Sequence, residues 1–103
     1  MAFEVVWTPN AREELTGVID YIADDLAAPT AAARLLDDIM SRVDDVAGLP
    51  KCCPLSAEDR LAERGFRKIV VGSFLIFYSV DETMGRIVIH DFLNGRRSYG
   101  DLL

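Results

Sequence analysis

The hydrophobic pattern changes its period midway along the chain, from helical spacing in the first half to strand-like runs in the second. Across residues 9–46, apolar side chains recur every three or four positions, as on the buried face of an amphipathic helix. Three dense runs of β-branched and aromatic residues follow, at residues 66–71, 74–80 and 86–92. Such runs are typical of strands. The pattern therefore predicts a helical part followed by a sheet.

The helical part contains a break at residues 27–29, which predicts two helices. Thr8 can cap the first helix, and Pro9 suits the first helical position because its missing amide donor is not needed there. We expect the second helix to end at Gly48 in the left-handed conformation, before Pro50 blocks continuation. The expected apolar stripes consist of Ala11, Leu15, Val18, Ile19, Ile22 and Leu26 in the first helix and Ala32, Leu35, Leu36, Ile39, Met40, Val43 and Val46 in the second. The two helices should form an antiparallel hairpin.

The sheet part predicts an antiparallel meander whose three strands are joined by short turns. Gly72 and Ser73 suit a tight hairpin loop, and residues 81–85 suit a looser one. Residues 3–7 add a short strand before the first helix. The expected order of one strand, two helices and three strands is an α+β fold in a single domain spanning residues 1–103. Because the helices would cover one face of the sheet, we expect function on the other, exposed face.

Composition changes this picture little, because a chain of 103 residues that is half apolar suits one globular domain. The longest apolar stretch, around residues 69–77, is interrupted by Gly72 and Ser73 and is too short to span a bilayer. The first residues lack the basic and apolar regions of a secretory signal. We therefore expect a cytoplasmic protein with no membrane segment.

Charge is distributed unevenly along a chain whose formal net charge is −6. Residues 1–59 contain four basic and twelve acidic side chains, whereas residues 60–100 contain seven basic and four acidic ones. The acidic total argues against nonspecific nucleic-acid binding, which excess positive charge favours through counterion release. The second half can nevertheless present a local cationic surface to an anionic ligand.

The cysteine and aspartate residues do not indicate a metal or cofactor site. Cys52 and Cys53 are adjacent, so a disulfide between them would close a strained small ring, and we expect free thiols. The sequence lacks a second cysteine pair or a histidine at ligand spacing, which disfavours zinc. The paired aspartates at residues 37–38 and 44–45 suit a solvated helix face, since no glycine-centred calcium loop surrounds them. We expect no metal and no cofactor.

The sharpest candidate site is the basic sequence that follows the last predicted strand. Arg96 and Arg97 can pair with phosphate or carboxylate oxygens, and in an extended segment Tyr99 would project to the same side as Arg97. The alternative is a solvated tail. His90, the only histidine, can transfer protons near neutral pH, although a lone histidine on a strand is more often a packing residue.

Two further basic residues, Arg67 and Lys68, lie at the start of the first strand of the meander. Alternation along a strand points them to opposite faces, so each face receives one basic side chain. They either solvate the end of the strand or contribute to an anion-binding site.

Six segments, taken in their order and spacing, resemble the RelE/ParE superfamily of bacterial toxins. The segments are residues 6–15 (VWTPNAREEL), 20–23 (DYIA), 29–32 (PTAA), 65–68 (GFRK), 74–80 (FLIFYSV) and 94–99 (NGRRSY). The resemblance covers nearly the whole chain. It implies a compact microbial ribonuclease-like fold and the toxin of a type II toxin–antitoxin module, with roles in growth inhibition and plasmid stabilisation.

The same resemblance implies a cognate antitoxin that neutralises the toxin in a hetero-oligomeric complex. A sheet edge and a helix groove suit an extended or helical antitoxin segment. We expect acidic antitoxin side chains opposite Arg96 and Arg97, and we expect Arg96, Arg97 and Tyr99 to form the surface that binds the antitoxin or the target.

Two mechanisms occur in this superfamily. ParE-like members are gyrase inhibitors, and the long helical hairpin, the segments at residues 20–22 and 29–32, and the acidic charge resemble this branch slightly more. RelE-like members are mRNA interferases that cut messenger RNA on the ribosome, usually without metal. A third alternative is an inactive toxin fold that acts only as a binding protein.

The resemblance to the RelE-like branch assigns catalytic roles by position. Arg67 and Arg97 would stabilise the phosphate in the transition state, and Tyr99 would be the C-terminal aromatic residue. Lys68 or His90 would transfer protons. The acidic total departs from this branch, whose ribosome-dependent members are typically strongly basic.

Overall fold

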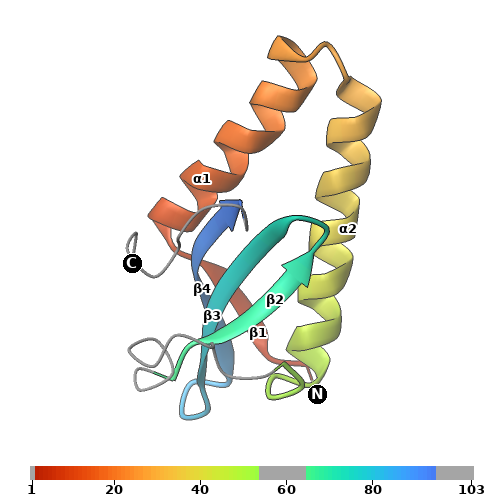
Figure 1. The fold of residues 1–103 in the computed structure, drawn as a ribbon. Helices are drawn as coiled ribbons and strands as arrows, with labels where there is room; N and C mark the ends of the chain where they lie inside the picture. The colour runs from red at the N-terminus through yellow and green to blue at the C-terminus, as the bar shows by residue number, and fades with distance from the viewer. Residues whose placement is uncertain (1, 54–64, 95–103) are drawn as a thin grey trace.

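The computed structural model describes residues 2–53 and 65–94. These residues form strand β1 (Glu4–Trp7), helix α1 (Pro9–Asp20), the π-helical segment η1 (Tyr21–Asp25), helix α2 (Pro29–Gly48) and strands β2 (Arg67–Val71), β3 (Phe74–Asp81) and β4 (Arg86–Asn94). Figure 1 shows α1 and α2 as an antiparallel pair beside a twisted sheet. The predicted α+β fold, a helical hairpin followed by an antiparallel meander, is confirmed.

Helix α1 begins as the sequence predicts. Oγ1 of Thr8 accepts a hydrogen bond from the Ala11 amide at 3.1 Å, and Pro9 is the first helical residue. The Thr8 amide donates to the Ile89 carbonyl at 3.0 Å. The start of α1 is therefore fixed both by its own cap and by β4.

The distal end of the first helix differs from the predicted continuous helix. Helix α1 changes into the π-helical turn η1, and the chain then reverses through Ala27 at φ +50. Leu26 is 55% exposed, so its expected place in the buried stripe is wrong, as is that of the exposed Met40 on α2. A π-helical turn holds an extra residue and shifts the stripe. In addition, η1 packs mainly on α1 and α2, beyond the sheet (Figure 1).

The end of α2 also differs in detail from its prediction. The helix ends at Gly48 as expected, but this glycine does not adopt a left-handed φ. Leu49 follows at φ −147 and ψ 75, outside the helical region, and its amide donates to the Val46 carbonyl at 3.0 Å. A tightened last turn thus satisfies the terminal carbonyl, which removes the need for a left-handed residue.

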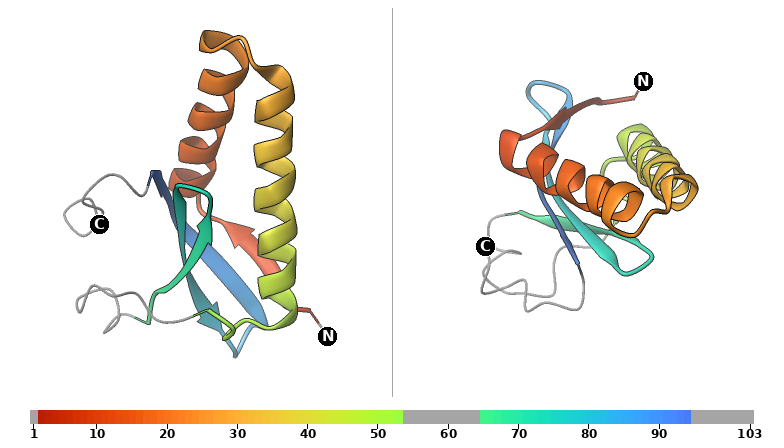
Figure 2. Two further views of the ribbon diagram at one scale, coloured as in Figure 1. Left: turned by 45° about the vertical axis from the view of Figure 1, so that its right-hand side comes forward. Right: turned by 90° about the horizontal axis from the view of Figure 1, so that it is seen from above.

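The sheet order is β1-β4-β3-β2, with β1 parallel to β4 and the remaining pairs antiparallel. Gly72, at φ +58, makes the tight turn between β2 and β3, as expected. The parallel partner of β1 is not indicated by the hydrophobic pattern. It places the first strand beside the last described strand, and Figure 2 shows the two running together below the helical hairpin.

A β-bulge interrupts the pairing of β3 with β4. Phe77 pairs with Asp91, whereas the next residue of β3 pairs with Ile89, so His90 is the extra residue. The His90 carbonyl accepts a hydrogen bond from Oγ1 of Thr8 at 3.3 Å. The bulge is therefore anchored to the first turn of α1, and it changes which side chains of β4 face the helices beyond this point.

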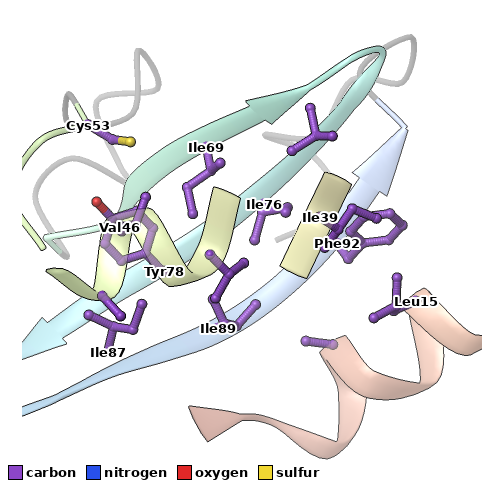
Figure 3. Packing of buried hydrophobic residues seen from close by; sticks show 14 residues of the cluster. Leu15, Ile39, Val46, Cys53, Ile69, Ile76, Tyr78, Ile87, Ile89 and Phe92 are labelled. Carbon is purple, nitrogen blue, oxygen red and sulfur yellow. The ribbon is translucent and has the colours of Figure 1, made fainter. Parts of the chain in front are cut away.

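The main core lies between the helices and one face of the sheet (Figure 3). Its buried members come from both helices, from the turn after α2 and from β2, β3 and β4. They are Ala11, Leu15, Ile39, Val43, Val46, Ala47, Cys53, Ile69, Val71, Ile76, Tyr78, Ile87, Ile89 and Phe92.

The opposite face of the sheet carries a second buried cluster, made of Phe66, Leu75, Phe77 and Leu93. Phe77 has 0% exposure. We expected the second face of the sheet to be exposed to solvent. This expectation is wrong for the apolar side chains on that face. Strand β3 carries large apolar side chains on both faces, and a strand with this composition needs cover on both.

Candidate functional site

The predicted basic residues of β2 are separated by the sheet. Arg67 shares the face of Ile69 and Val71, which belong to the main core, and its Nη1 donates to the Cys53 carbonyl at 2.6 Å. Lys68 pairs with Phe77 in the register and projects to the other face. Arg67 is half-buried and bonded to the backbone, so it is a structural support for the turn after α2 rather than a side chain that solvates the strand end.

His90 lies on the face opposite the main core. Its ring stacks on Phe66 with 4.7 Å between the ring centroids and 15° between the planes. Its Nε2 lies 2.8 Å from Oγ of Ser79, and either atom can be the donor, depending on the tautomer. The bulge therefore presents a stacked imidazole that is hydrogen-bonded to a hydroxyl, a pair that can hold or relay a proton.

Sequence reasoning did not identify Ser79 as a partner of His90. The register explains the contact, because Ser79 pairs with Val88, two residues before His90 on the same face of β4. The register between β3 and β4 would have identified Ser79 as this partner. That register depends on how many residues the turn at residues 81–85 contains. The structure brings His90 to the face of Lys68 and places Arg67 on the other.

Arg96, Arg97 and Tyr99, the sharpest candidates from the sequence, lie outside the described residues. Strand β4 ends at Asn94, immediately before them. Asn94 and its neighbour Leu93 line a groove of about 430 Å³ between α1 and the ends of β3 and β4.

This groove, which we call the α1 groove, has mainly apolar walls. Phe74 and Phe92 stack with ring centroids 5.1 Å apart and form part of its sheet side. Tyr21, which is 53% exposed, lines its helix side. The remaining lining residues are Glu13, Glu14, Gly17, Val18, Ile22, Leu93 and Asn94. Among the described residues, the charged side chains of the α1 groove are all acidic.

Glu14 connects the α1 groove to the bulge. Its Oε1 accepts a hydrogen bond from Nδ2 of Asn10 at 3.0 Å and from the Phe92 amide at 3.4 Å, and the same Nδ2 contacts Oδ1 of Asp91 at 3.0 Å. Burial raises the pKa of Glu14, the Phe92 amide lowers it, and the nearby Asp91 raises it. The net effect is a raised pKa, as expected for a carboxyl group that is partly buried beside another one.

A second hollow, of about 580 Å³, lies on the other side of α1, against Trp7, Arg12 and Asp20. The two hollows share Glu13 and Gly17. A Cβ atom added at Gly17 would have no neighbour within 4 Å. Helix α1 is therefore accessible from both sides along its middle turns.

The described part of the chain holds no group of three side chains suited to a metal ion. Cys52 and Cys53 are free thiols, as predicted, with 3.6 Å between their sulfur atoms. The paired aspartates at residues 37–38 and 44–45 are exposed on α2, as expected for a solvated face. Within residues 2–53 and 65–94, no helix is both long and apolar enough to cross a membrane.

A family model described as the ParE toxin of the type II toxin–antitoxin system parDE matches residues 5–99. The chain has no significant match among curated protein sequences. In structure it is similar to a chain of the chromosomal ParDE system from P. aeruginosa, with a TM-score of 0.71, 18% identity and coverage of 90% of this chain and 96% of that one.

The structure is also similar to a chain of the toxin–antitoxin complex RelBE2 from Mycobacterium tuberculosis. Here the TM-score is 0.63 at 16% identity, covering 91% of this chain and 99% of the other. At these identities the likenesses establish the fold. The sequence match over residues 5–99 adds the family.

Proposed function

Because the chain belongs to the ParE toxin family of type II toxin–antitoxin systems, we propose that it inhibits growth by acting on DNA gyrase. The match of a ParE model to residues 5–99 carries this proposal, since gyrase is the target that resemblance to the ParE-like branch implies. The placement of Arg67 supports it as well. This side chain is bonded to the Cys53 carbonyl on the helix side, away from Lys68 and His90, whereas the RelE-like reading needs Arg67 to stabilise a phosphate near a proton-transfer group.

The second candidate function is cleavage of messenger RNA on the ribosome, without metal. The contact between His90 and Ser79 favours it, because it positions an imidazole beside a proton donor and acceptor on the face that Lys68 shares. Under this alternative, Arg97 and Tyr99 complete the site. Arg97→Ala should then abolish cleavage without unfolding the protein, and retained cleavage by this variant would remove Arg97 from the mechanism.

Inducing the chain alone in bacteria separates these targets. DNA and protein synthesis are followed within minutes by uptake of labelled thymidine and labelled methionine. Action on gyrase predicts an early loss of DNA synthesis with filamentation, while translation continues. An early fall in translation with intact DNA synthesis would instead support messenger RNA cleavage, and harmless expression of a soluble, folded product would favour an inactive binding protein.

We further propose that the antitoxin covers the α1 groove. The groove combines stacked aromatic rings with an exposed tyrosine and an accessible α1, which suits the apolar face of a helix or an extended segment. Its acidic walls at Glu13 and Glu14 call for a basic antitoxin residue at this position. The acidic antitoxin side chains expected opposite Arg96 and Arg97 remain a separate prediction, since those arginines lie outside the described residues.

Tyr21→Ser tests this placement against a matched control. The protein encoded beside the toxin gene serves as the antitoxin, and its affinity is measured by calorimetry. Losing an aromatic contact at an interface should weaken binding by about 1–2 kcal/mol. Leu26→Ser removes a comparably exposed apolar side chain outside the lining of the groove and should leave the affinity unchanged. Equal effects of the two substitutions would contradict the α1 groove as the docking site.

A further inference from the structure

The turn after α2 positions two neighbouring thiols on a built support. Cys53 is buried in the main core, whereas Cys52 is exposed, so the pair can be reached from one side. Their sulfur atoms lie 3.6 Å apart. Figure 3 shows Cys53 beside Tyr78 and Val46, at the edge of the core.

Four contacts hold this turn in place. Nη1 of Arg67 donates to the Cys53 carbonyl at 2.6 Å, and the Tyr78 hydroxyl donates to the Pro50 carbonyl at 2.7 Å. The Cys52 amide donates to the Leu49 carbonyl at 2.9 Å. An exposed ion pair between Lys51 and Glu82 adds the fourth contact. The thiol pair is therefore positioned by the fold and does not depend on sequence adjacency alone.

The geometry disfavours a disulfide and favours a bridging atom. Neighbouring Cα atoms are about 3.8 Å apart, whereas disulfides usually span about 4.4–6.8 Å between Cα atoms. Two sulfurs bound through bonds of about 2.3 Å to one pyramidal trivalent centre, whose lone pair holds the angle between them near roughly 100°, lie about 3.5 Å apart. The two thiols are in hydrogen-bonding contact at 3.6 Å, with either sulfur as the donor, so the second arrangement needs little movement of the turn.

We propose that Cys52 and Cys53 form a chelating site for a thiophilic trivalent centre, of which a monosubstituted arsenical is the clearest example. Such an arsenical carries its own carbon ligand, so the two protein sulfurs complete its three bonds. In the reaction two As–S bonds form, both thiol protons join the departing oxygen, and one water molecule leaves. Arsenic stays trivalent, so no oxidant or reductant is needed.

The protonation state of the pair suits this condensation. Partial desolvation raises the pKa of the exposed Cys52 thiol, and the neighbouring Cys53 raises it further. Burial and the neighbouring Cys53 likewise raise the pKa of Tyr78, so its hydroxyl stays protonated and keeps donating to Pro50. Protonated thiols react slowly with alkylating reagents, whereas the arsenical reaction uses their protons to release water.

Phenylarsine oxide is the probe, and binding is measured on the purified full-length chain by intact-mass spectrometry and by calorimetry. We expect one equivalent to bind and the thermal midpoint to rise slightly, since the folded turn preorganises the two thiols and so binds the ligand more tightly than the unfolded chain does. Cys52→Ser and Cys53→Ala should each weaken binding by about 100-fold or more, because the second bond gains from a high effective concentration. Zinc alone should not compete, as two thiols leave its coordination incomplete.

Two variants test whether the fold builds the site. Arg67→Met and Tyr78→Phe each remove one anchor of the turn and leave both thiols in place. Without that anchor, a cysteine side chain must be ordered when the probe binds, which should weaken binding roughly 2- to 10-fold. Circular dichroism checks that each variant is folded. If the wild type binds the probe no more tightly than the single-cysteine variants do, the proposal that both thiols chelate it is wrong. If both anchor variants bind the probe as tightly as the wild type does, the fold does not preorganise the pair. None of these measurements depends on the toxin's target.

Discussion

The two ends of the helical hairpin are built in opposite ways. At its base, Arg67 and Tyr78 reach from the sheet and donate hydrogen bonds to the turn after α2. At its tip, Tyr21 and Leu26 are more than half exposed, and the chain reverses through Ala27 at a positive φ. Polar side chains thus stabilise the base of the hairpin, where the chain is buried. At the tip, which extends beyond the sheet, apolar side chains remain exposed. This contrast indicates that the base maintains the fold, while the α1 groove, which Tyr21 lines at the tip, is available to a partner.

Among these substitutions, removing the arginine that anchors the base should change the free energy of unfolding most. Arg67→Met keeps the aliphatic stem but leaves the Cys53 carbonyl without its charged donor. We expect the free energy of unfolding to fall by about 2 kcal/mol, the usual range for a hydrogen bond to a charged group. Urea denaturation measures the loss.

Lys68→Met is the matched control for this substitution. The Lys68 side chain makes no hydrogen bond or ion pair with the described residues, while its backbone belongs to the pairing of β2 with β3. Its replacement should therefore change stability by less than about 0.5 kcal/mol. Equal losses for the two variants would show that the base does not depend on the bond between Arg67 and Cys53.

Removing one hydroxyl from the base should have the next largest effect. Tyr78→Phe keeps the buried ring and deletes only the donor to the Pro50 carbonyl, which lies 2.7 Å away. The expected loss is about 1 kcal/mol, measured by the same urea titration. An unchanged midpoint would indicate that the Pro50 carbonyl finds another donor.

The tip should respond in the opposite direction. Ala27 adopts φ +50, where its Cβ is strained, so Ala27→Gly relieves this cost. Part of the gain is offset because glycine loses more chain entropy on folding. We expect the variant to be more stable by about 0.5 kcal/mol, with its thermal midpoint rising accordingly. A destabilised variant would mean that the left-handed residue is not a source of strain.

The smallest expected change in the free energy of unfolding comes from the carboxylate of Glu14, which lies between the base and the tip of the hairpin, and it depends on pH. The raised pKa of Glu14 means that the folded state binds its proton more tightly than the unfolded state does. Stability from this group is therefore greatest below the unfolded pKa and is lost as pH rises through the folded pKa. Glu14→Gln removes the titration and can keep the bond to the Phe92 amide.

We expect Glu14→Gln to be slightly more stable than the wild type at pH 7, by less than about 0.5 kcal/mol because the side chain is only partly buried and solvent screens its charge. This advantage should disappear below pH 4.5. Urea midpoints at both pH values provide the comparison. An advantage that grows on acidification would reverse the assigned sign.

Most of the fold follows from local sequence signals. The period of three to four residues predicts both helices, Thr8 and Pro9 predict the start of α1, and Gly72 predicts the first hairpin turn. The failures occur where tertiary context decides. Leu26 fits the helical stripe, but no described strand underlies the tip, and the extra residue of the π-helical turn changes the register.

The candidate site was predictable only in part, for a related reason. Alternation correctly places Arg67 and Lys68 on opposite faces, but it does not reveal that the Cys53 carbonyl accepts from Arg67. The contact between His90 and Ser79 depends on strand register and on the bulge, neither of which a single strand encodes. The α1 groove is formed by segments distant in sequence, so no single motif announces it.

The parallel pairing of β1 with β4 bears on how the protein is made. β1 leaves the ribosome before both helices, whereas its register partners, Arg86 to Ile89, are synthesised after them. Both helices can form during synthesis, because their hydrogen bonds are local, but the sheet cannot close until its last strand has emerged. A nascent chain therefore carries β1 without its sheet partner until β4 has been synthesised. The helices are exposed during that interval, which gives a partner already present in the cell an opportunity to bind before the sheet closes.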